Sequence, residues 1–137
     1  ENPEYHYNKG YALLYLHRYG EALREFSKAT ELDSNNPEYH YGKGLAFYSL
    51  GLYEEALNEV NKAMELTPSD PYYLVLYAKL EAKLGSSKEG FEKIKDLIKS
   101  GIVNKDELCE IVNEELEEVE PDDKEELVLK KIKAKIC

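Results

Sequence analysis

The 137-residue sequence is poor in several residue types, and each shortage argues against a class of protein. It has only two cysteines, Cys109 and Cys137, which are too few and too far apart for a disulfide framework or a zinc site, so we expect a reducing, cytoplasmic setting. No apolar run approaches the roughly 18 residues of a membrane span, and no signal-peptide pattern is present. Because residue 1 is not methionine, we expect the chain to be a piece of a longer protein.

Basic residues are also scarce beside acidic ones, which leaves a formal net charge of −10. Most of the excess lies in residues 103–126, where twelve acids accompany two lysines. A phosphate backbone would be repelled by this segment, so we do not expect nucleic-acid binding. The acidic run could recruit cations or a basic partner, but a solvated helix face is the more usual role of such a run.

The end of the chain has the opposite charge, because residues 127–137 contain four lysines and no acid. With Val128, Ile132 and Ile136 they form a basic amphipathic stretch that could touch a membrane surface or the groove of a partner. We favour a third interpretation, a terminal helix whose apolar stripe closes the core, and therefore do not expect membrane binding.

Tyrosine, by contrast, is abundant, with twelve residues, and several of them lie in a sequence that occurs twice. Residues 2–10 read NPEYHYNKG and residues 36–44 read NPEYHYGKG. Aligning residues 2–35 with 36–69 at an offset of 34 gives 19 identities, and a second offset reaches Pro71 in a worn third copy, residues 70–101. Similarity at a fixed period of this length indicates a helical-repeat array.

Each copy is predicted to form two helices. Pro3, Pro37 and Pro71 suit the first turn of a helix, and each follows an Asn or Asp that can cap it. Gly51 and Gly85 fall where a helix should end. Small residues recur where the two helices of a pair must approach closely. One pair cannot bury its apolar face alone, so the copies are predicted to stack into an all-α solenoid.

This pattern resembles the tetratricopeptide repeat family. In the second copy the signature positions of the family are held by His40, Gly44, Phe47, Ala56, Val60, Ala63 and Pro68. The departures are lysine in a leucine position (Lys9, Lys43), histidine in the tryptophan position (His6, His40) and Ser34 in place of proline. The resemblance implies a right-handed superhelix of three helix–turn–helix repeats over residues 1–101. Residues 102–137 are predicted to add an acidic helix and a basic amphipathic one, as a capping pair or an eroded fourth repeat, and we prefer the cap.

In this family the first helix of each repeat lines a concave channel that holds a peptide, and the matching positions here are candidate contact residues. They are Tyr7, Asn8, Tyr11, Tyr15, Tyr41, Leu45, Tyr48, Tyr72, Leu76 and Lys79. Tyrosine supplies contact area at a low entropic cost, although about half of these rings are expected to pack between helices. The positions at which chaperone-binding members grip an acidic C-terminal carboxylate hold tyrosine, glycine and leucine here. The expected ligand is therefore an apolar or aromatic peptide, or a helix with an apolar stripe.

The sequence offers little chemistry for a catalytic or metal site. His6 and His40 occupy the same position in two stacked helices, but the nearest carboxylates, Glu4 and Glu38, are two residues away, which on a helix points elsewhere. We interpret both histidines as packing residues and place His17 on the surface. No cofactor, metal or catalytic group is predicted, and we do not expect an enzyme.

The function predicted from the sequence is a non-catalytic scaffold that binds a protein or peptide. The alternative is structural: self-association, in which the open tyrosine-rich end at residues 1–16 stacks on another copy or on upstream repeats. The oligomeric state of the dilute protein separates the two.

Overall fold

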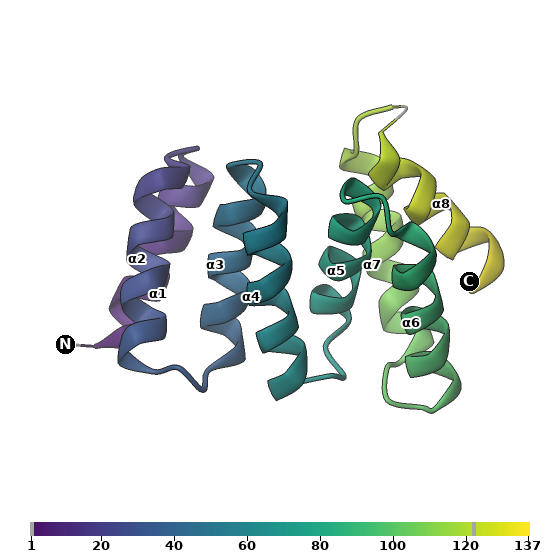
Figure 1. The fold of residues 1–137 in the computed structure, drawn as a ribbon, viewed down its shortest axis with the longest axis horizontal. Coiled ribbons are helices and arrows are strands. Elements are labelled where there is room, and N and C mark those ends of the chain that lie inside the picture. Colours follow the sequence, from purple (N-terminus) through teal and green to yellow (C-terminus); the bar gives the residue numbers. More distant parts are fainter. Residues whose placement is uncertain (1, 122) are drawn as a thin grey trace. The chain divides into compact units, whose positions relative to one another are not determined.

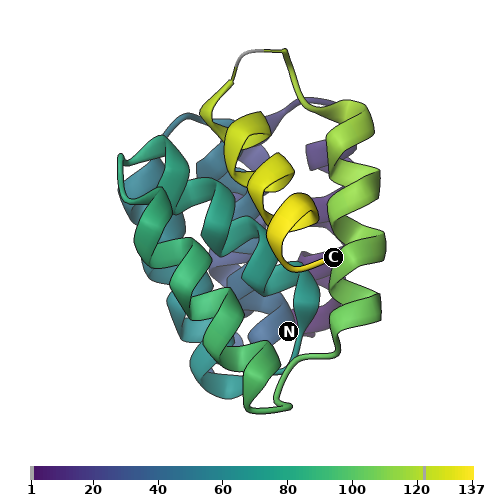
Figure 2. The ribbon, with the colours of Figure 1, turned by 90° about the vertical axis from the view of Figure 1, so that its right-hand side faces the viewer.

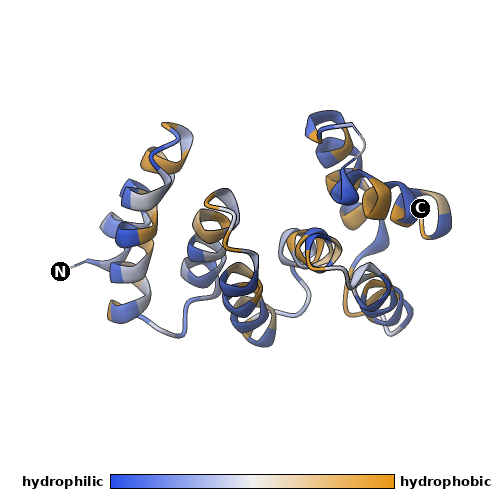
Figure 3. Ribbon diagram, turned by 45° about the horizontal axis from the view of Figure 1, so that its top comes forward, coloured by the Kyte–Doolittle hydropathy of each residue, from blue (hydrophilic) through white to orange (hydrophobic). Residues whose placement is uncertain are grey.

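The computed structural model describes residues 2–121 and 123–137, and within them the chain forms eight α-helices and no strand (Figure 1). The helices are α1 (Pro3–Tyr15), α2 (Tyr19–Leu32), α3 (Pro37–Ser49), α4 (Tyr53–Leu66), α5 (Pro71–Lys83), α6 (Ser87–Lys99), α7 (Lys105–Glu118) and α8 (Lys124–Lys135). Hydrophobic and hydrophilic residues occur together on the helices, as expected of helices that bury one face (Figure 3). In the described part of the chain no helix is long and apolar enough to cross a membrane.

The helices fall into two compact units, an N-terminal unit (Glu1–Thr67) with α1–α4 and a C-terminal unit (Pro68–Cys137) with α5–α8. The third predicted repeat, α5 and α6, thus shares a unit with the last two helices rather than with the first two repeats.

The starts of α1, α3 and α5 confirm the predicted capping. Each helix has proline in its first turn. The side chains of Asn2, Asn36 and Asp70 each accept a hydrogen bond from the backbone N–H two residues later. Each cap satisfies an N–H group that the helix itself leaves without a partner.

The turns within the repeats confirm the predicted helix ends. Gly51 and Gly85 adopt φ values of +77° and +87°, the left-handed region in which glycine is favoured. The matching position of the first repeat holds His17, which adopts φ 59° although it is not glycine. His17 is exposed, as predicted, and its Nδ1 lies 2.5 Å from the hydroxyl oxygen of Tyr19.

The N-terminal unit is built around Phe26 of α2, which is completely buried. A Cβ atom added to Gly10 of α1 would lie 2.8 Å from Phe26 Cε1, and one added to Gly42 of α3 would lie 2.6 Å from it. The ring therefore fills the space that two glycines leave on either side of it. These two glycines set how closely α1 and α3 approach α2.

The C-terminal unit is built around α5, which packs against α6, α7 and α8 (Figure 2). Nine of its residues are buried. α8 also packs against α7 and α6. The last two helices thus cover α5 directly, in addition to its own repeat partner α6.

The two cysteines are joined, which corrects the expectation from the sequence. Cys109 of α7 and Cys137, just beyond α8, form a disulfide, with their Cα atoms 5.9 Å apart. Their separation of 28 residues in the sequence is misleading because α8 returns along α7 and brings the two residues together. Two cysteines exclude a framework of several disulfides but still allow a single disulfide. The cysteine count therefore does not support a reducing setting.

Candidate functional site

The candidate contact residues of the N-terminal unit lie on α1 and α3, which pack against each other. We call them the tyrosine stripe: Tyr7, Asn8, Tyr11, Tyr15, Tyr41, Leu45 and Tyr48. Asn8 and Tyr15 are exposed, Tyr15 to 81%, and the other five are half-buried. A half-buried ring is held in place by packing while part of its surface still faces solvent.

Tyr7 is the centre of an aromatic cluster that ties α1 to its neighbours. Its ring centroid lies 5.0 Å from that of Tyr11, 5.1 Å from that of Tyr39 and 6.1 Å from that of Phe26. The Tyr11 ring also meets Phe26 edge-on, with 5.2 Å between centroids. Such pairs add about 0.5–1.5 kcal/mol beyond the area that they bury. Tyr7 and Tyr11 therefore contribute to helix packing as well as to the surface of the stripe.

The phenol groups of Tyr7 and Tyr39, at the centre of the aromatic cluster, are uncharged at neutral pH. Burial raises the pKa of the Tyr7 hydroxyl, and the carboxylate of Glu38 raises it further, whereas a hydrogen bond with Tyr11 acts in the opposite direction. Burial also raises the pKa of the neighbouring Tyr39. Both phenols therefore stay protonated in neutral solution, and each presents an apolar ring with a polar tip.

The two histidines of the repeated sequence are buried, with exposed fractions of 5% for His6 and 7% for His40. His6 Nδ1 lies 2.8 Å from Glu25 Oε1, and His40 Nδ1 lies 2.9 Å from Glu59 Oε1. His40 Nε2 lies 2.7 Å from the carbonyl oxygen of Ser34. Each histidine thus joins the first helix of its repeat to the second, a structural role that agrees with the packing interpretation.

The partner glutamates are ionised acceptors. The hydrogen bond with His6 lowers the pKa of Glu25, against the opposing effect of burial. Burial acts to raise the pKa of Glu59, but hydrogen bonds with His40 and Lys62 outweigh it, and the pKa is lowered. Both carboxylates remain charged at neutral pH, although their side chains are at most 9% exposed.

Sequence reasoning missed Glu25 and Glu59 as the hydrogen-bond partners of the two buried histidines. The signal was present, because each histidine precedes its glutamate by 19 residues and the pair recurs at the repeat offset. No group of three or more His, Cys, Asp or Glu side chains among the described residues could hold a metal ion.

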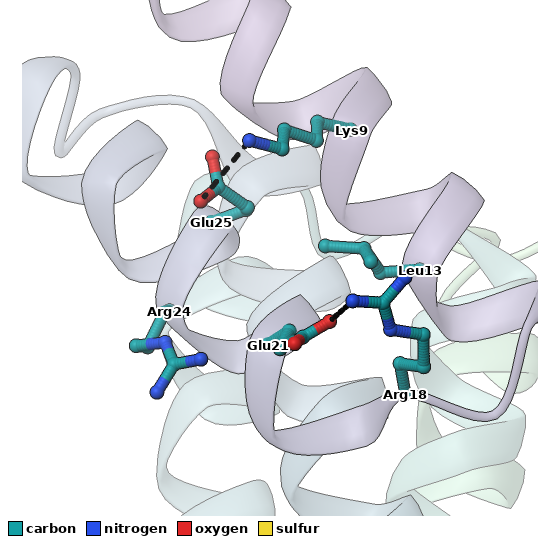
Figure 4. A pocket seen from close by; sticks show the side chains of 6 residues that line it. All are labelled: Lys9, Leu13, Arg18, Glu21, Arg24 and Glu25. Carbon is teal, nitrogen blue, oxygen red and sulfur yellow. Dashed lines mark ion pairs between the residues drawn. The ribbon is translucent and has the colours of Figure 1, made fainter.

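A pocket of about 320 Å³ lies between α1 and α2 (Figure 4). It is lined by Lys9, Leu13, Arg18, Glu21, Arg24 and Glu25. Arg18 Nη2 lies 2.5 Å from Glu21 Oε2 and lowers the pKa of that carboxyl group, and Lys9 Nζ lies 4.0 Å from Glu25 Oε2. Because both of its acids are already paired with bases, the pocket offers little attraction to a cationic ligand, and we assign it no function.

The candidate residues of the third repeat lie on α5, in the C-terminal unit, and are placed differently. Tyr72 is 50% exposed, whereas Leu76 and Lys79 are only 3% and 9% exposed. The Lys79 ammonium group donates a hydrogen bond to Glu115 of α7, at 2.7 Å. Leu76 and Lys79 are therefore buried in this structure, which corrects their assignment to an open channel.

Comparisons with known proteins agree with this architecture. The family described as Tetratricopeptide repeat matches residues 7–88. The comparison with curated proteins gives no match. Among solved structures, MamA 41-end from Desulfovibrio magneticus RS-1 has a TM-score of 0.65 at 21% identity, covering 69% of this chain and 53% of that chain. The chain thus spans about half the length of that MamA structure.

Two structures of PcrH are also similar. PcrH in complex with the chaperone binding region of PopB has a TM-score of 0.64 at 25% identity, covering 72% of this chain and 82% of that chain. PcrH in complex with the chaperone binding region of PopD has a TM-score of 0.65 at 18% identity, covering 97% of this chain and 89% of that chain.

The family match extends over more than half of the sequence and includes both strong copies of the repeat. The caps, the left-handed turns and the paired helices recur at the same offset as the sequence identities. The chain is an all-α, helical-repeat protein and belongs to the tetratricopeptide repeat family.

Proposed function

We propose that the protein is a non-catalytic scaffold that binds an apolar or aromatic peptide, or a helix with an apolar stripe, on the tyrosine stripe of its N-terminal unit. The observation that carries the proposal is the row of half-buried tyrosines on α1 and α3: Tyr7, Tyr11, Tyr41 and Tyr48. Rings that are held by packing lose little conformational entropy on binding, which is why tyrosine is enriched at binding hot spots.

The chemistry of the stripe favours a neutral ligand surface. It contains phenol rings, Leu45 and the amide of Asn8, with no lysine or arginine among its members. An acidic tail would find no cation there, whereas apolar and aromatic side chains can stack on the tyrosines.

The similar structures support a protein or peptide as the class of ligand. The two PcrH structures are complexes with the chaperone binding regions of PopB and PopD. Those complexes show that a protein of similar fold can hold a segment of another protein.

Self-association through the first repeat is the alternative, and the exposure of Tyr5, Tyr15 and Leu16 favours it. The position of Asn8 argues against it. In the second repeat that position is Gly42, and α2 reaches α3 only because glycine leaves room for Phe26. A helix with phenylalanine at the matching position could not approach α1 as closely, so we place peptide binding first.

The test is selection of peptides from a random library on the full chain. Beside it runs a variant with Tyr7, Tyr41 and Tyr48 changed to alanine, and Tyr5→Ala serves as a control outside the stripe. We expect peptides with shared apolar or aromatic anchors whose affinity falls at least about tenfold in the triple variant and is unchanged by Tyr5→Ala. Circular dichroism must show that the triple variant is helical.

Equal enrichment on the wild type and the helical triple variant would contradict the proposal. Light scattering across a concentration series then decides the alternative, because a self-associating chain would not remain monomeric on dilution.

A further inference from the structure

One face of α5 carries side chains that differ in charge from the tyrosine stripe. Leu76, Lys79 and Lys83 follow one another at intervals of three and four residues and so lie on the same side of the helix. At the repeat offset, Lys79 corresponds to Leu45 and Tyr11 of the stripe. We call these three residues the lysine stripe.

The carboxylates of α7 and α8 cover the lysine stripe. Lys79 Nζ lies 2.7 Å from Glu115 Oε2 and 3.7 Å from Glu125 Oε1. Lys83 Nζ lies 2.9 Å from Asp123 Oδ2 and 3.6 Å from Glu125 Oε2. Glu125 thus lies between the two ammonium groups, and it is only 5% exposed.

The helix α8, which supplies most of the carboxylates over the lysine stripe, has one apolar side and one basic side. Val128, Leu129 and Ile132 are buried within the unit, while Lys130 and Lys131 are exposed. Its N-terminal end brings Asp123 and Glu125 to the lysine stripe. The segment that fits this face is therefore a helix with carboxylates at its start, followed by a row of aliphatic side chains.

The contact between α8 and the lysine stripe is specific rather than strongly stabilising. Removing charges from water offsets much of the attraction within a buried ion pair, so apolar residues would hold a permanent cap at least as well. Lysine has another property: its ammonium group can return to water when the covering helix leaves, whereas an apolar face would stay exposed and associate nonspecifically. The far end of α8 is tied to α7 by the Cys109–Cys137 disulfide.

We propose that the lysine stripe is a binding face for an amphipathic helix of a partner protein that carries carboxylates at its start. This helix replaces α8 once a thiol reductant has supplied two electrons and two protons, which convert the Cys109–Cys137 disulfide to two thiols and untie α8 from α7. The charge complementarity between Lys79, Lys83 and the carboxylates that now cover them identifies the chemistry of that partner. The proposal does not depend on the tyrosine stripe. It involves other residues, and its ligand carries carboxylates, whereas the ligand proposed for the tyrosine stripe is apolar or aromatic.

The test uses the full chain with Cys109→Ser and Cys137→Ser, in which α8 is untied. The probe is a fluorescent peptide of residues 123–137 with serine at 137, and its control carries Asp123→Asn and Glu125→Gln. We expect the probe to bind the untied chain at least tenfold more tightly than the wild type with its disulfide intact. The control peptide should bind the untied chain at least tenfold more weakly than the probe.

Charge reversal locates the site. Lys79→Glu with Lys83→Glu in the untied chain should reduce probe binding at least tenfold, whereas the matched change of two exposed lysines of α6, Lys88→Glu with Lys99→Glu, should leave it unchanged. The proposal is overturned if the helical untied chain does not bind the probe, or if both double variants bind it equally. A dimer of the untied chain that exchanges α8 would also overturn it, because the occupant would then be a second copy.

A second measurement covers the case in which the untied chain does not fold. Hydrogen exchange of the wild type should show the amides of α8 opening at least tenfold faster than those of α5 after dithiothreitol has reduced the disulfide. Equal exchange rates of α8 and α5 in the reduced protein would make α8 an inseparable part of the core and would overturn the proposal.

Discussion

The tyrosine stripe of the N-terminal unit and the lysine stripe of the C-terminal unit hold equivalent positions of the repeat but have different neighbours. Tyr11 is half-buried among aromatic rings, whereas Lys79 is buried under carboxylates of α7 and α8. The position in the repeat sets the direction of a side chain. The charge of that side chain then determines which groups pack over it. Lysine at such a position is paired with carboxylates of α7 and of the start of α8, while the tyrosine is packed against other aromatic rings.

The largest expected effect is a loss of stability that is confined to the C-terminal unit. Replacing Cys109 and Cys137 with serine removes a bridge that closes a loop of 28 residues, and should lower the free energy of unfolding of that unit by about 3–4 kcal/mol. The N-terminal unit contains no cysteine and should keep its stability. Denaturant unfolding followed by residue-resolved NMR separates the two units. An equal loss in both would show that they unfold together.

The next effect is confined to the N-terminal unit. Gly42→Ala places a Cβ atom 2.6 Å from the buried Phe26 ring and should destabilise the unit by about 1–3 kcal/mol. Gly20→Ala is the matched control, because nothing lies within 4 Å of its added Cβ and alanine favours the helix. The same unfolding measurement should show opposite signs for the two variants. Identical destabilisation would contradict the close packing around Phe26.

Lowering the pH should reduce the stability of the N-terminal unit by weakening the histidine–glutamate pairs. The folded-state pKa of Glu59 lies below its ordinary value of 4.5, so its contribution to stability is present above that pH and is lost as the pH falls through the folded-state pKa. Glu59→Gln should lower the stability of the N-terminal unit at pH 7 by about 1–2 kcal/mol and flatten its dependence on pH below 4.5.

A glutamate of the C-terminal unit provides the control for the acid titration. Burial and the nearby Glu89 raise the pKa of Glu81, so its stabilising contribution is present at low pH and is lost as the pH rises through the raised value. Glu81→Gln should therefore not protect the protein from acid. Unfolding curves between pH 3 and 7 check both variants, and a wild type whose N-terminal unit is equally stable throughout would contradict the pairing.

The smallest effect concerns the turn of the first repeat. His17 adopts a left-handed conformation in which Gly51 and Gly85 serve the other two repeats. His17→Gly relieves that strain but loses the contact with Tyr19, so we expect a net gain of roughly 0.5 kcal/mol. Thermal unfolding measures it, with Arg18→Gly, just beyond the turn, as the control that should destabilise. Destabilisation by His17→Gly would mean that the contact with Tyr19 outweighs the strain.

Local features of the fold were predictable from the sequence. The caps at Asn2, Asn36 and Asp70 and the turns at Gly51 and Gly85 depend only on residues close in sequence, and the repeat shows each feature more than once. Packing of the first repeat against the second, through α2 and α3, followed from the same pattern.

Features that depend on distant residues were not predictable. The burial of Leu76 and Lys79 involves helices outside the repeat register, so no periodicity signals it. The disulfide likewise depends on how α8 returns along α7. For the tyrosines, the sequence indicated a face but could not separate the packing role of Tyr7 from its exposure.

The most direct test of the account is to map where a selected peptide binds on the full chain with its disulfide intact. Backbone amide chemical shifts should change along α1 and α3, around Tyr7, Tyr41 and Tyr48. The amide chemical shifts of α5 and α8 should stay the same. Shifts concentrated on α5 and α8, with α1 and α3 unaffected, would contradict the assignment of the tyrosine stripe as the binding face.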